Sequence, residues 1–236
     1  MSDNAAAINI FPASENTLLI TWPEKICPVQ HQQIVNLAQQ LNSDFPQYIA
    51  ETVISYNSLL LYYYFDKIST DSLNQQILEL WNSAPKNNDF HPDSNSIIEI
   101  PVYYGDEVAL DLKDVARESK QTTTAVIELH SQRLYRAYAL GFTPGFCYLG
   151  SLAKELVLPR KQTPRLAIAK GAVAIAEQQT AVYPNVSPGG WHIIGKTPIE
   201  MYQVSNNDFS PTINVGDMVK FIPIERSTFI ELGGKL

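Results

Sequence analysis

The sequence is poor in charge and in cysteine. Charged residues make up 17% of its 236 residues and hydrophobic residues 45%, whereas soluble domains average about 25% charged residues. This composition excludes a disordered, solvating chain, and the length is enough for one large domain or two small ones. Two cysteines, Cys27 and Cys147, are too few for the disulfide scaffold of a small secreted domain. The net charge of −7 disfavours binding to the phosphate backbone of a nucleic acid.

Targeting and membrane signals are also missing from the sequence. Residues 1–5 have neither the basic region nor the apolar run of a signal peptide. The longest apolar stretch, residues 59–65, is far shorter than the roughly 20 residues that a membrane helix needs. The sequence therefore predicts a soluble, cytoplasmic protein without membrane contact.

The first part of the chain predicts a small α/β domain. β-branched and aromatic runs indicate strands, and apolar residues at helical spacing indicate helices, the second of them capped by Asp71. In chain order the expected elements are a short strand near residues 8–11, a strand at 18–22, a helix at 34–41, strands at 52–56 and 59–65 joined by a turn at Asn57-Ser58, a helix at 71–81 and a strand at 97–102. The order strand, helix, strand, strand, helix, strand is the plan of a ferredoxin-like domain.

Residues 85–95 are predicted to form a linker. The segment is polar, contains Pro85 and Pro92, and shows no apolar period. It separates the amino-terminal domain, residues 1–84, from a second domain at residues 96–236. The sequence leaves open whether the strand at 97–102 completes the first sheet or begins the second domain.

The second domain changes from helices to many short strands. Helices are expected at residues 112–118, capped by Asp111, and at 123–130, capped by Thr122. Short strands broken by Gly and Pro follow at residues 134–140, 165–169, 172–176, 181–183, 191–194, 200–204, 218–222 and 228–232. Such a pattern predicts a β-barrel or a β-sandwich. The expected fold class is therefore α+β with two domains.

No metal site is predicted. The histidines His31, His91, His130 and His192 are scattered, and none stands at ligand spacing from another metal-binding side chain. Each is interpreted as a surface or capping residue. Cys147 is expected to be buried and unreactive, because no neighbouring cation in the sequence lowers the pKa of its thiol.

Residues 190–197, Gly-Trp-His-Ile-Ile-Gly-Lys-Thr, match the phosphate-loop pattern G-x-x-x-x-G-K-[ST] letter for letter. That motif needs a glycine-rich loop followed by a helix whose N-terminus faces the phosphates. Here the intervening residues are bulky, and residues 198–204 alternate as a strand does. The segment is therefore interpreted as a β-hairpin that turns through residues 195–198.

A basic stretch stands out in this acidic chain, formed by Lys154, Arg160, Lys161, Arg165 and Lys170. Arg160 and Arg165 are candidates to bind a carboxylate or an acyl phosphate, since a guanidinium donates two parallel hydrogen bonds to such groups. The alternative is a solvated basic edge of a hairpin that prevents further strand pairing. The sequence does not decide between the two.

Aromatic residues and prolines gather in short loops. They are either core and turn material or the lining of a groove beside the barrel. Glycines among them would let the backbone approach a ligand closely. The aromatic residues and prolines are Phe142, Pro144, Phe146, Tyr148, Tyr183, Pro184, Pro188 and Trp191, and the glycines are Gly145, Gly189 and Gly190.

Motifs along nearly the whole chain resemble one protein family. They include Pro101-Val102-Tyr103-Tyr104-Gly105, Gly141-Phe142-Thr143-Pro144-Gly145-Phe146, Tyr148-Leu149-Gly150, Thr163-Pro164-Arg165, Gln179-Thr180 and Ser187-Pro188-Gly189-Gly190-Trp191. Together they resemble the family that contains the B subunit of 5-oxoprolinase, the sporulation-kinase inhibitor and allophanate hydrolase subunit 1. The resemblance implies a small α/β amino-terminal domain and a cyclophilin-like β-barrel carboxy-terminal domain.

The resemblance also implies a function, the ATP-dependent opening of 5-oxoproline to glutamate. Partner subunits would take part, the ATP site is not assigned to this chain, and the chain alone would be inactive. The alternatives are a module that inhibits a sensor histidine kinase and a subunit of an allophanate or urea-carboxylate hydrolase assembly. No catalytic residue is identified. The residues expected to bind a small carboxylate substrate are Phe142, Pro144, Gly145, Phe146, Tyr148, Arg160, Arg165, Gln179, Tyr183, Gly189, Gly190 and Trp191.

The sequence departs from this family at a few positions. Cys147 stands where the family usually has proline, and Ala174, Glu177 and Ala181 stand where small residues, often glycine, are usual. These replacements are expected to alter the mouth of the groove. Relatives often have arginine at the position of Lys196. A phosphate-binding loop would not tolerate that exchange, so the match to the phosphate-loop pattern is interpreted as accidental.

Overall fold

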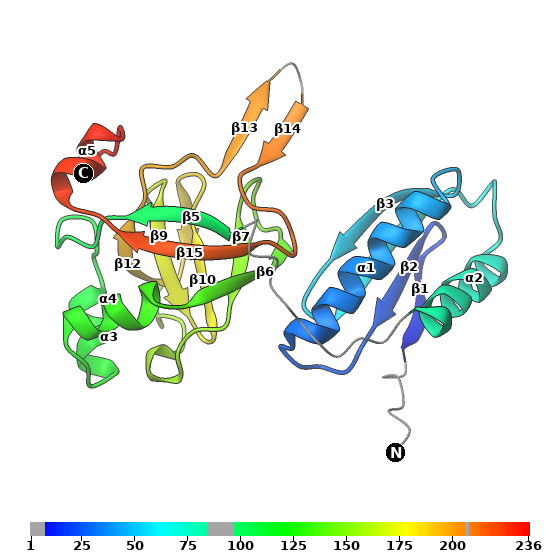
Figure 1. Cartoon of the computed structure of the whole chain (residues 1–236), viewed down its shortest axis with the longest axis horizontal. Coiled ribbons are helices and arrows are strands. Elements are labelled where there is room, and N and C mark those ends of the chain that lie inside the picture. Colours follow the sequence, from blue (N-terminus) through cyan, green and yellow to red (C-terminus); the bar gives the residue numbers. More distant parts are fainter. Residues whose placement is uncertain (1–7, 85–96, 206–207) are drawn as a thin grey trace. The chain divides into compact units, whose positions relative to one another are not determined.

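The computed structural model describes residues 8–84, 97–205 and 208–236. The chain divides into two compact units between residues 92 and 93, and the elements of each are labelled in Figure 1. The predicted linker, residues 85–95, lies outside the described residues.

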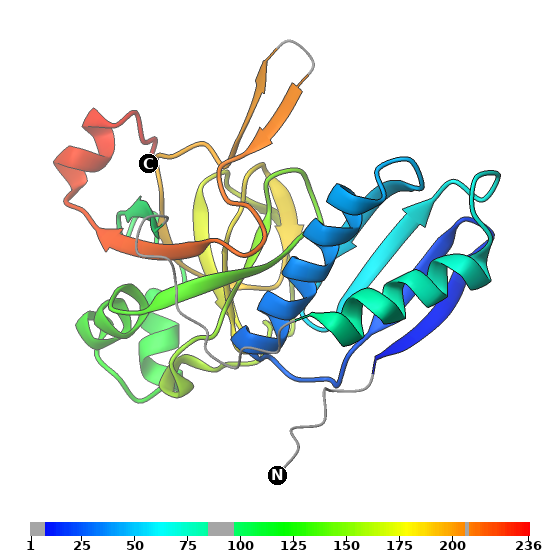
Figure 2. The ribbon, with the colours of Figure 1, turned by 45° about the vertical axis from the view of Figure 1, so that its right-hand side comes forward.

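The amino-terminal unit is a four-stranded antiparallel sheet with two helices on one face (Figure 2). Alternate residues of the two central strands point into the core, where Leu18 and Leu59 are fully buried together with Ile34 and Ile77 of the helices. The core is thus made by strands of period two packed on helices of period 3.6. The elements are β1 (Asn9–Ser14), β2 (Thr17–Thr21), α1 (Pro28–Asp44), β3 (Ile49–Ile54), β4 (Ser58–Tyr63) and α2 (Thr70–Ser83), with the strands in the order β1-β2-β4-β3.

The predicted ferredoxin-like plan is not completed in the expected order. It requires the strand after α2 to join the first sheet, but β5 (Ile97–Val102) lies in the sheet of the second unit, and β1 occupies the edge beside β2. The cap predicted for α2 is also wrong. Ser69 is the N-cap, with its Oγ accepting a hydrogen bond from the backbone N–H of Ser72 at 3.3 Å, and Asp71 lies in the first turn. Serine and aspartate cap equally well, so the sequence does not single out one of them.

The carboxy-terminal unit is built on a seven-stranded sheet that curls into a nearly closed barrel (Figure 1). Its two edge strands meet at Tyr103 and Lys196, where each backbone N–H donates to the other residue's carbonyl oxygen at 2.8 Å. A Cβ on Gly195 would lie 2.7 Å from Cγ1 of Val102, so glycine is needed for this closure. The strand order is β12 (His192–Lys196), β9 (Ala172–Ala176), β10 (Gln179–Val182), β7 (Cys147–Gly150), β6 (Leu134–Leu140), β15 (Met218–Pro223) and β5.

Further elements cover the barrel or project from it. Helices α3 (Leu112–Glu118) and α4 (Thr123–Ser131) pack on each other, and Thr122 caps α4 as predicted, with its Oγ1 accepting from the N–H of Ala125 at 3.1 Å. The arm that projects in Figure 1 is made of two paired strands. The remaining elements are the 3-10 helix η1 (Lys154–Leu156), the paired strands β8 (Arg165–Ile168) and β11 (Ser187–Gly189), the arm strands β13 (Tyr202–Ser205) and β14 (Asp208–Pro211), and α5 (Arg226–Glu231).

The strand β9 separates two hydrophobic cores. Val173 and Ile175 face the barrel interior, whereas Ala172, Ala174 and Ala176 face an outer core. A strand buried on both faces reads as a continuous apolar run instead of an alternating one. The small alanines leave room on the outer side for the aromatic residues that pack there.

Two predicted elements are wrong. Residues 228–232, expected as a strand, lie mostly in helix α5, whose Phe229 is fully buried and contacts the Tyr103 ring at 5.5 Å between centroids. Gly233, with a φ of 88°, ends this helix, and that stop signal outweighs the β-branched composition. The expected hairpin through residues 195–198 is also absent, because β12 pairs with β9 and β13 pairs with β14. The strand character of the phosphate-loop look-alike is nevertheless confirmed.

The sequence predicts each histidine to be a surface or capping residue, but the histidines of the described chain are buried. His31 and His130 are fully buried, and His192 is nearly so. His130 stacks on Phe221 with 4.5 Å between ring centroids. His91 lies outside the described residues.

A hydrogen-bonded chain fixes the tautomer of His130. The hydroxyl of Thr180 donates to the carbonyl oxygen of Ala174 at 3.1 Å, so it accepts from Nε2–H of His130 at 2.9 Å. Nδ1 then accepts from the hydroxyl of Tyr104 at 2.8 Å. The neutral ring is fully satisfied, and burial lowers the pKa of His130 to about 3.

Acid should therefore weaken the second unit through His130. The unfolded chain takes up a proton near the ordinary histidine pKa of about 6.5, whereas the native imidazole stays neutral down to a pKa of about 3. The free energy of unfolding should fall by up to about 1.4 kcal/mol per pH unit as the pH drops through that window. Urea denaturation at about pH 7 and about pH 5 measures this, and the difference should shrink in His130→Gln. An equal pH dependence in that variant would contradict the prediction.

Candidate functional site

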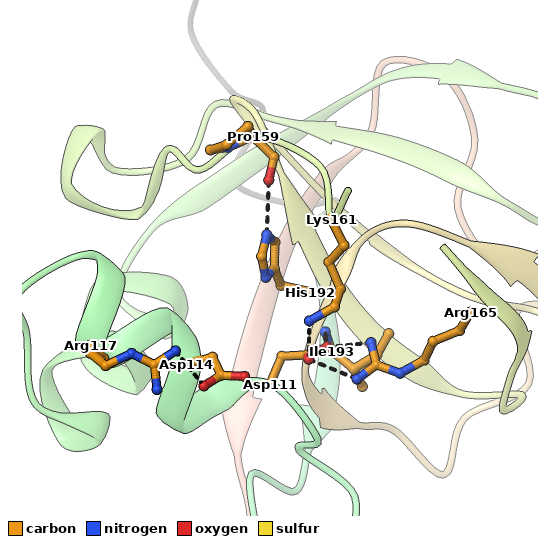
Figure 3. Close-up of polar contacts among 8 residues, drawn as sticks. All are labelled: Asp111, Asp114, Arg117, Pro159, Lys161, Arg165, His192 and Ile193. Carbon is orange, nitrogen blue, oxygen red and sulfur yellow. Dashed lines mark hydrogen bonds and ion pairs between the residues drawn. The ribbon is translucent and has the colours of Figure 1, made fainter. Parts of the chain in front are cut away.

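A buried carboxylate, Asp111, lies at the start of α3 and joins three parts of the second unit (Figure 3). It is 1% exposed. One carboxylate oxygen accepts from Nζ of Lys161 at 2.7 Å, and both terminal nitrogens of Arg165 donate to the carboxylate at 2.7 and 2.8 Å. The backbone N–H of Ile193 donates to it at 2.7 Å. We call Asp111, Lys161, Arg165 and Ile193 the Asp111 cluster.

The electrostatics of the Asp111 cluster favour the ionised form. Burial alone raises the pKa of the Asp111 carboxyl, but the hydrogen bonds from Arg165, Lys161 and Ile193 outweigh it and the pKa is lowered. The same pairing raises the pKa of Arg165. The sequence predicts Asp111 as a helix cap, yet its side chain makes no capping hydrogen bond. The predicted position is confirmed, since Asp111 is the N-cap residue and its carbonyl oxygen accepts from the N–H of Val115 at 2.8 Å. The side chain does not cap the helix, because the cations and the Ile193 N–H take all of its acceptor capacity.

His192 holds the same loop from another side. Its Nε2 donates to the carbonyl oxygen of Pro159 at 2.9 Å, as Figure 3 shows. The backbone N–H of Lys161 donates to the carbonyl oxygen of Gly190 at 2.8 Å. The segment from residue 159 to residue 165 is thus fixed to β12 and α3 at several points. Within the described part of the chain, Nδ1 of His192 is buried and has no hydrogen-bond partner.

The two arginines singled out in the sequence contact different carboxylates. Arg165 is half-buried and bound to Asp111, whereas Arg160 is exposed and lies 3.6 Å from a carboxylate oxygen of Glu177. Lys170 of the same basic stretch pairs with Glu200. The stretch therefore divides among separate acidic partners and does not form one fork around a shared ligand.

Most of the predicted groove aromatics form the outer core. Phe146, Tyr183 and Trp191 are buried in it, and the Phe146 ring meets those of Tyr183 and Trp191 edge to face at 5.4 and 5.8 Å. Of the predicted aromatic residues, Tyr148 is half-buried and Phe142 is 61% exposed. For the three buried residues, the structure agrees with the alternative that they are core material.

Two of the three predicted site glycines are required by close packing. A Cβ on Gly189 would lie 2.2 Å from the hydroxyl oxygen of Tyr183, and one on Gly145, whose φ is 82°, would lie 2.7 Å from Cδ1 of Tyr202. Gly190 has only ordinary contacts for an added Cβ. Pro144 is exposed, and Gln179 pairs with Gly150 of β7 and Ala176 of β9.

Three of the four departures from the family pattern, Cys147, Ala174 and Ala181, lie in packed positions. Ala174 and Ala181 face each other across β9 and β10 and are fully buried in the outer core, so they do not form the mouth of a groove. Glu177 lies in the turn between these strands with a φ of 53°, in the left-handed region that favours glycine. Cys147 is buried as predicted, and burial raises the pKa of its thiol well above the ordinary range.

A small pocket opens beside the Asp111 cluster. It has a volume of about 210 Å³ and is lined by Glu107, Val108, Leu110, Arg165, Ala167, Ile168, Ala169, Ala172, Ile193, Lys196 and Leu236. We call it the β8 pocket. Its lining is mostly apolar and includes the cations Arg165 and Lys196. Glu107 is already bound, since it accepts from the Tyr103 hydroxyl and from Nε of Arg226, each at 3.0 Å. The sequence does not indicate this pocket, because its residues come from distant segments.

Metal-binding clusters and membrane-spanning helices are both missing from the described ranges. No group of three or more His, Cys, Asp or Glu side chains within residues 8–84, 97–205 and 208–236 is placed to hold a metal ion. None of the helices in those ranges has the length and apolar character required to cross a membrane.

The chain is similar to proteins of one family over nearly its whole length. The family model described as "Carboxyltransferase domain, subdomain C and D" matches residues 8–212. The B subunit of the Haemophilus influenzae 5-oxoprolinase is 38% identical over 91% of this chain and 97% of its own length.

Solved structures show the same architecture. TTHA0988 superposes with a TM-score of 0.75 at 32% identity over 89% of this chain, and the match spans 40% of the longer TTHA0988 chain. The urea carboxylase of Kluyveromyces lactis superposes with a TM-score of 0.75 over 98% of this chain and 23% of its own, at 17% identity. That second likeness concerns the fold alone.

Replacing Asp111 by asparagine should destabilise the second unit strongly. The variant leaves Lys161 and Arg165 without their anionic partner. The free energy of unfolding should fall by about 2 to 3 kcal/mol. This is at the low end for a broken buried ion pair, because both cations are partly exposed. Asp114→Asn is the matched control, since its pair with Arg117 lies on the surface and should matter by less than about 1 kcal/mol. Urea unfolding of both variants measures this, and equal losses would contradict the structural role of the Asp111 cluster.

Glycine at position 177 should stabilise the protein. Glu177→Gly removes the strain of a left-handed residue, worth about 1 to 2 kcal/mol. This exceeds the roughly 0.5 to 1 kcal/mol that glycine costs through the entropy of the unfolded chain and the small contribution of the exposed ion pair with Arg160. Gln178→Gly is the matched control, because its φ is not in that region and glycine there should only add chain entropy to the unfolded state. The midpoint of urea unfolding should rise for the first variant and fall for the second. A fall for both would show that Glu177 is not strained.

Proposed function

The chain belongs to the carboxyltransferase subdomain C and D family, which includes the B subunit of 5-oxoprolinase. We propose that this protein is a subunit of an ATP-dependent 5-oxoprolinase. The observation that carries the proposal is the match over 97% of the length of a relative with that name. The complex would open 5-oxoproline to glutamate and hydrolyse ATP, and we place it in the cytoplasm. The chain alone would be inactive.

The β8 pocket is the proposed site for the small substrate. 5-Oxoproline is a five-membered lactam with one carboxylate, so it requires a small apolar pocket with a cation at one side. Apolar walls from Ile168, Ala172 and Ile193 and the cations Arg165 and Lys196 supply these features in about 210 Å³. Lys196 is the better candidate for the substrate carboxylate, because two terminal nitrogens of Arg165 already donate to Asp111.

The chemistry of opening a lactam explains why the reaction would need ATP and hydrogen-bond donors. An unstrained lactam is a poor electrophile, and phosphorylation of its amide oxygen would make the carbonyl carbon open to attack by water. Hydrogen-bond donors must then stabilise the charge that develops on the oxygen. Glu107, the carboxylate that lines the β8 pocket, is bound to Arg226 and Tyr103. This supports a shared active site in which a partner supplies the general base.

The fold assignments belong to the same proposal. The amino-terminal unit fits a variant of the ferredoxin-like plan in which β1 takes the edge position of the missing last strand. The barrel of the second unit fits a cyclophilin-like domain. The domain limits are residues 1–84 and 96–236, with the linker between them.

Reconstitution with the partner subunits tests the function. The complete mixture should hydrolyse ATP faster when 5-oxoproline is added, and leaving out this chain should remove that stimulation. Lys196→Gln should raise the KM for 5-oxoproline about tenfold, since it removes the charge offered to the carboxylate, whereas Lys154→Gln on η1 should not. A complete mixture that ignores the lactam would refute the proposal. Stimulation by allophanate instead would favour the urea-carboxylate alternative.

A further inference from the structure

A second pocket lies next to the β8 pocket and is lined by three lysines. It has a volume of about 280 Å³ and is formed by the loop before β9, the segment after β12 and the residues after α5. We call it the three-lysine pocket. The lining residues that matter here are Lys170, Gly171, Lys196, Glu200, Gly234 and Lys235.

Backbone hydrogen bonds hold the frame of this pocket. The N–H of Thr197 donates to the carbonyl oxygen of Gly171 at 2.9 Å. The N–H of Gly171 in turn donates to the carbonyl oxygen of Tyr183 at 2.8 Å. Gly171 has a φ of 81°, and a Cβ there would lie 2.5 Å from the carbonyl oxygen of Thr197. The N–H of Gly234 donates to the carbonyl oxygen of Phe229 at 2.8 Å. The cations therefore stand on a preformed frame.

The charge of the pocket is opposite to that of the protein. The lining contains three lysines and one glutamate, which leaves an excess of two positive charges in a chain whose net charge is −7. Nζ of Lys170 contacts Glu200 and Nζ of Lys196 donates to the carbonyl oxygen of Lys235, each at 2.5 Å. An ammonium has three N–H donors, so each contact uses one of them. Burial lowers the pKa of Lys196, which shows that its charge is incompletely solvated.

We propose that the three-lysine pocket binds a phosphate group. A phosphate carries up to two negative charges and accepts several charge-assisted hydrogen bonds, which matches an excess of two positive charges and free ammonium donors. Recognition would rest on ammonium groups and not on loop N–H groups. Lys196 thus contributes to a phosphate site although residues 190–197 do not form a phosphate-binding loop.

The position of Lys196 connects this site to the proposed function. Lys196 lines both the β8 pocket and the three-lysine pocket. A phosphate in one pocket would therefore lie next to a small substrate in the other. The phosphate would belong to a nucleotide or to the phosphorylated substrate, and this choice of source rests on the proposed function.

Calorimetric titration of the full-length chain alone tests the site. The probes are inorganic phosphate, ATP, adenosine and acetyl phosphate as a simple acyl phosphate. Lys196→Gln and Lys235→Gln should each weaken phosphate or ATP binding about tenfold. Glu200→Gln should tighten it, because it frees Lys170 and removes a competing anion. Lys154→Gln and Glu155→Gln, at exposed positions on η1, are the matched controls and should have little effect.

The outcomes separate the sources and the two proposals. Tighter binding of ATP than of acetyl phosphate, with no binding of adenosine, assigns the site to nucleotide phosphates, and the reverse order assigns it to the phosphorylated substrate. No binding of any phosphate, or binding that is unchanged in both lysine variants, would overturn the site. The titration uses neither lactam nor partner subunits. The chain can therefore fail to bind phosphate while the complete mixture still shows lactam-stimulated ATP hydrolysis, or bind phosphate while the mixture shows no such stimulation.

Discussion

The buried carboxylate of Asp111 is the constraint on which the second unit is organised. A charge that is 1% exposed is costly unless several donors replace its water. The donors come from three places, the loop at Lys161, the start of β8 at Arg165 and the backbone of β12 at Ile193. Satisfying one oxyanion thus fixes the outer strand pair against the barrel, and the same contact places Arg165 in the wall of the β8 pocket.

Lys196 has a structural role through its backbone and a proposed functional role through its side chain. Its N–H and carbonyl close the barrel against Tyr103, while its side chain lines both pockets. Gly195 permits the close approach of the two edge strands. Barrel closure therefore explains Gly195, and the two pockets are the proposed reason for the lysine side chain. The resemblance to the phosphate-binding loop lies in the sequence pattern and not in the conformation.

Local patterns predict local elements well. The predicted bounds of β6, β9 and α3 agree with the structure, since alternation, a doubly buried run and helical spacing are properties of neighbouring residues. Thr122 is a correct cap for the same reason. Asp111 is also the N-cap residue of α3 as predicted, but its side chain binds Lys161 and Arg165, which stand 50 and 54 residues away. No local pattern records a pairing at that distance. The two pockets could not be predicted from the sequence for the same reason, because the residues that line each of them come from segments that meet only after folding.

The carboxylates that line the two pockets, Glu107 and Glu200, are both bound to cations. Glu107 of the β8 pocket is bound to Arg226, and Glu200 of the three-lysine pocket is bound to Lys170. Hydrogen bonds from its own backbone N–H and from Arg226 lower the pKa of Glu107, and a carboxylate held by a cation is a weak proton acceptor. The lining of both pockets is thus suited to binding anions and poorly suited to activating water. The proposed function follows this division: the pockets of this chain would hold the substrate, and a partner subunit would supply the base.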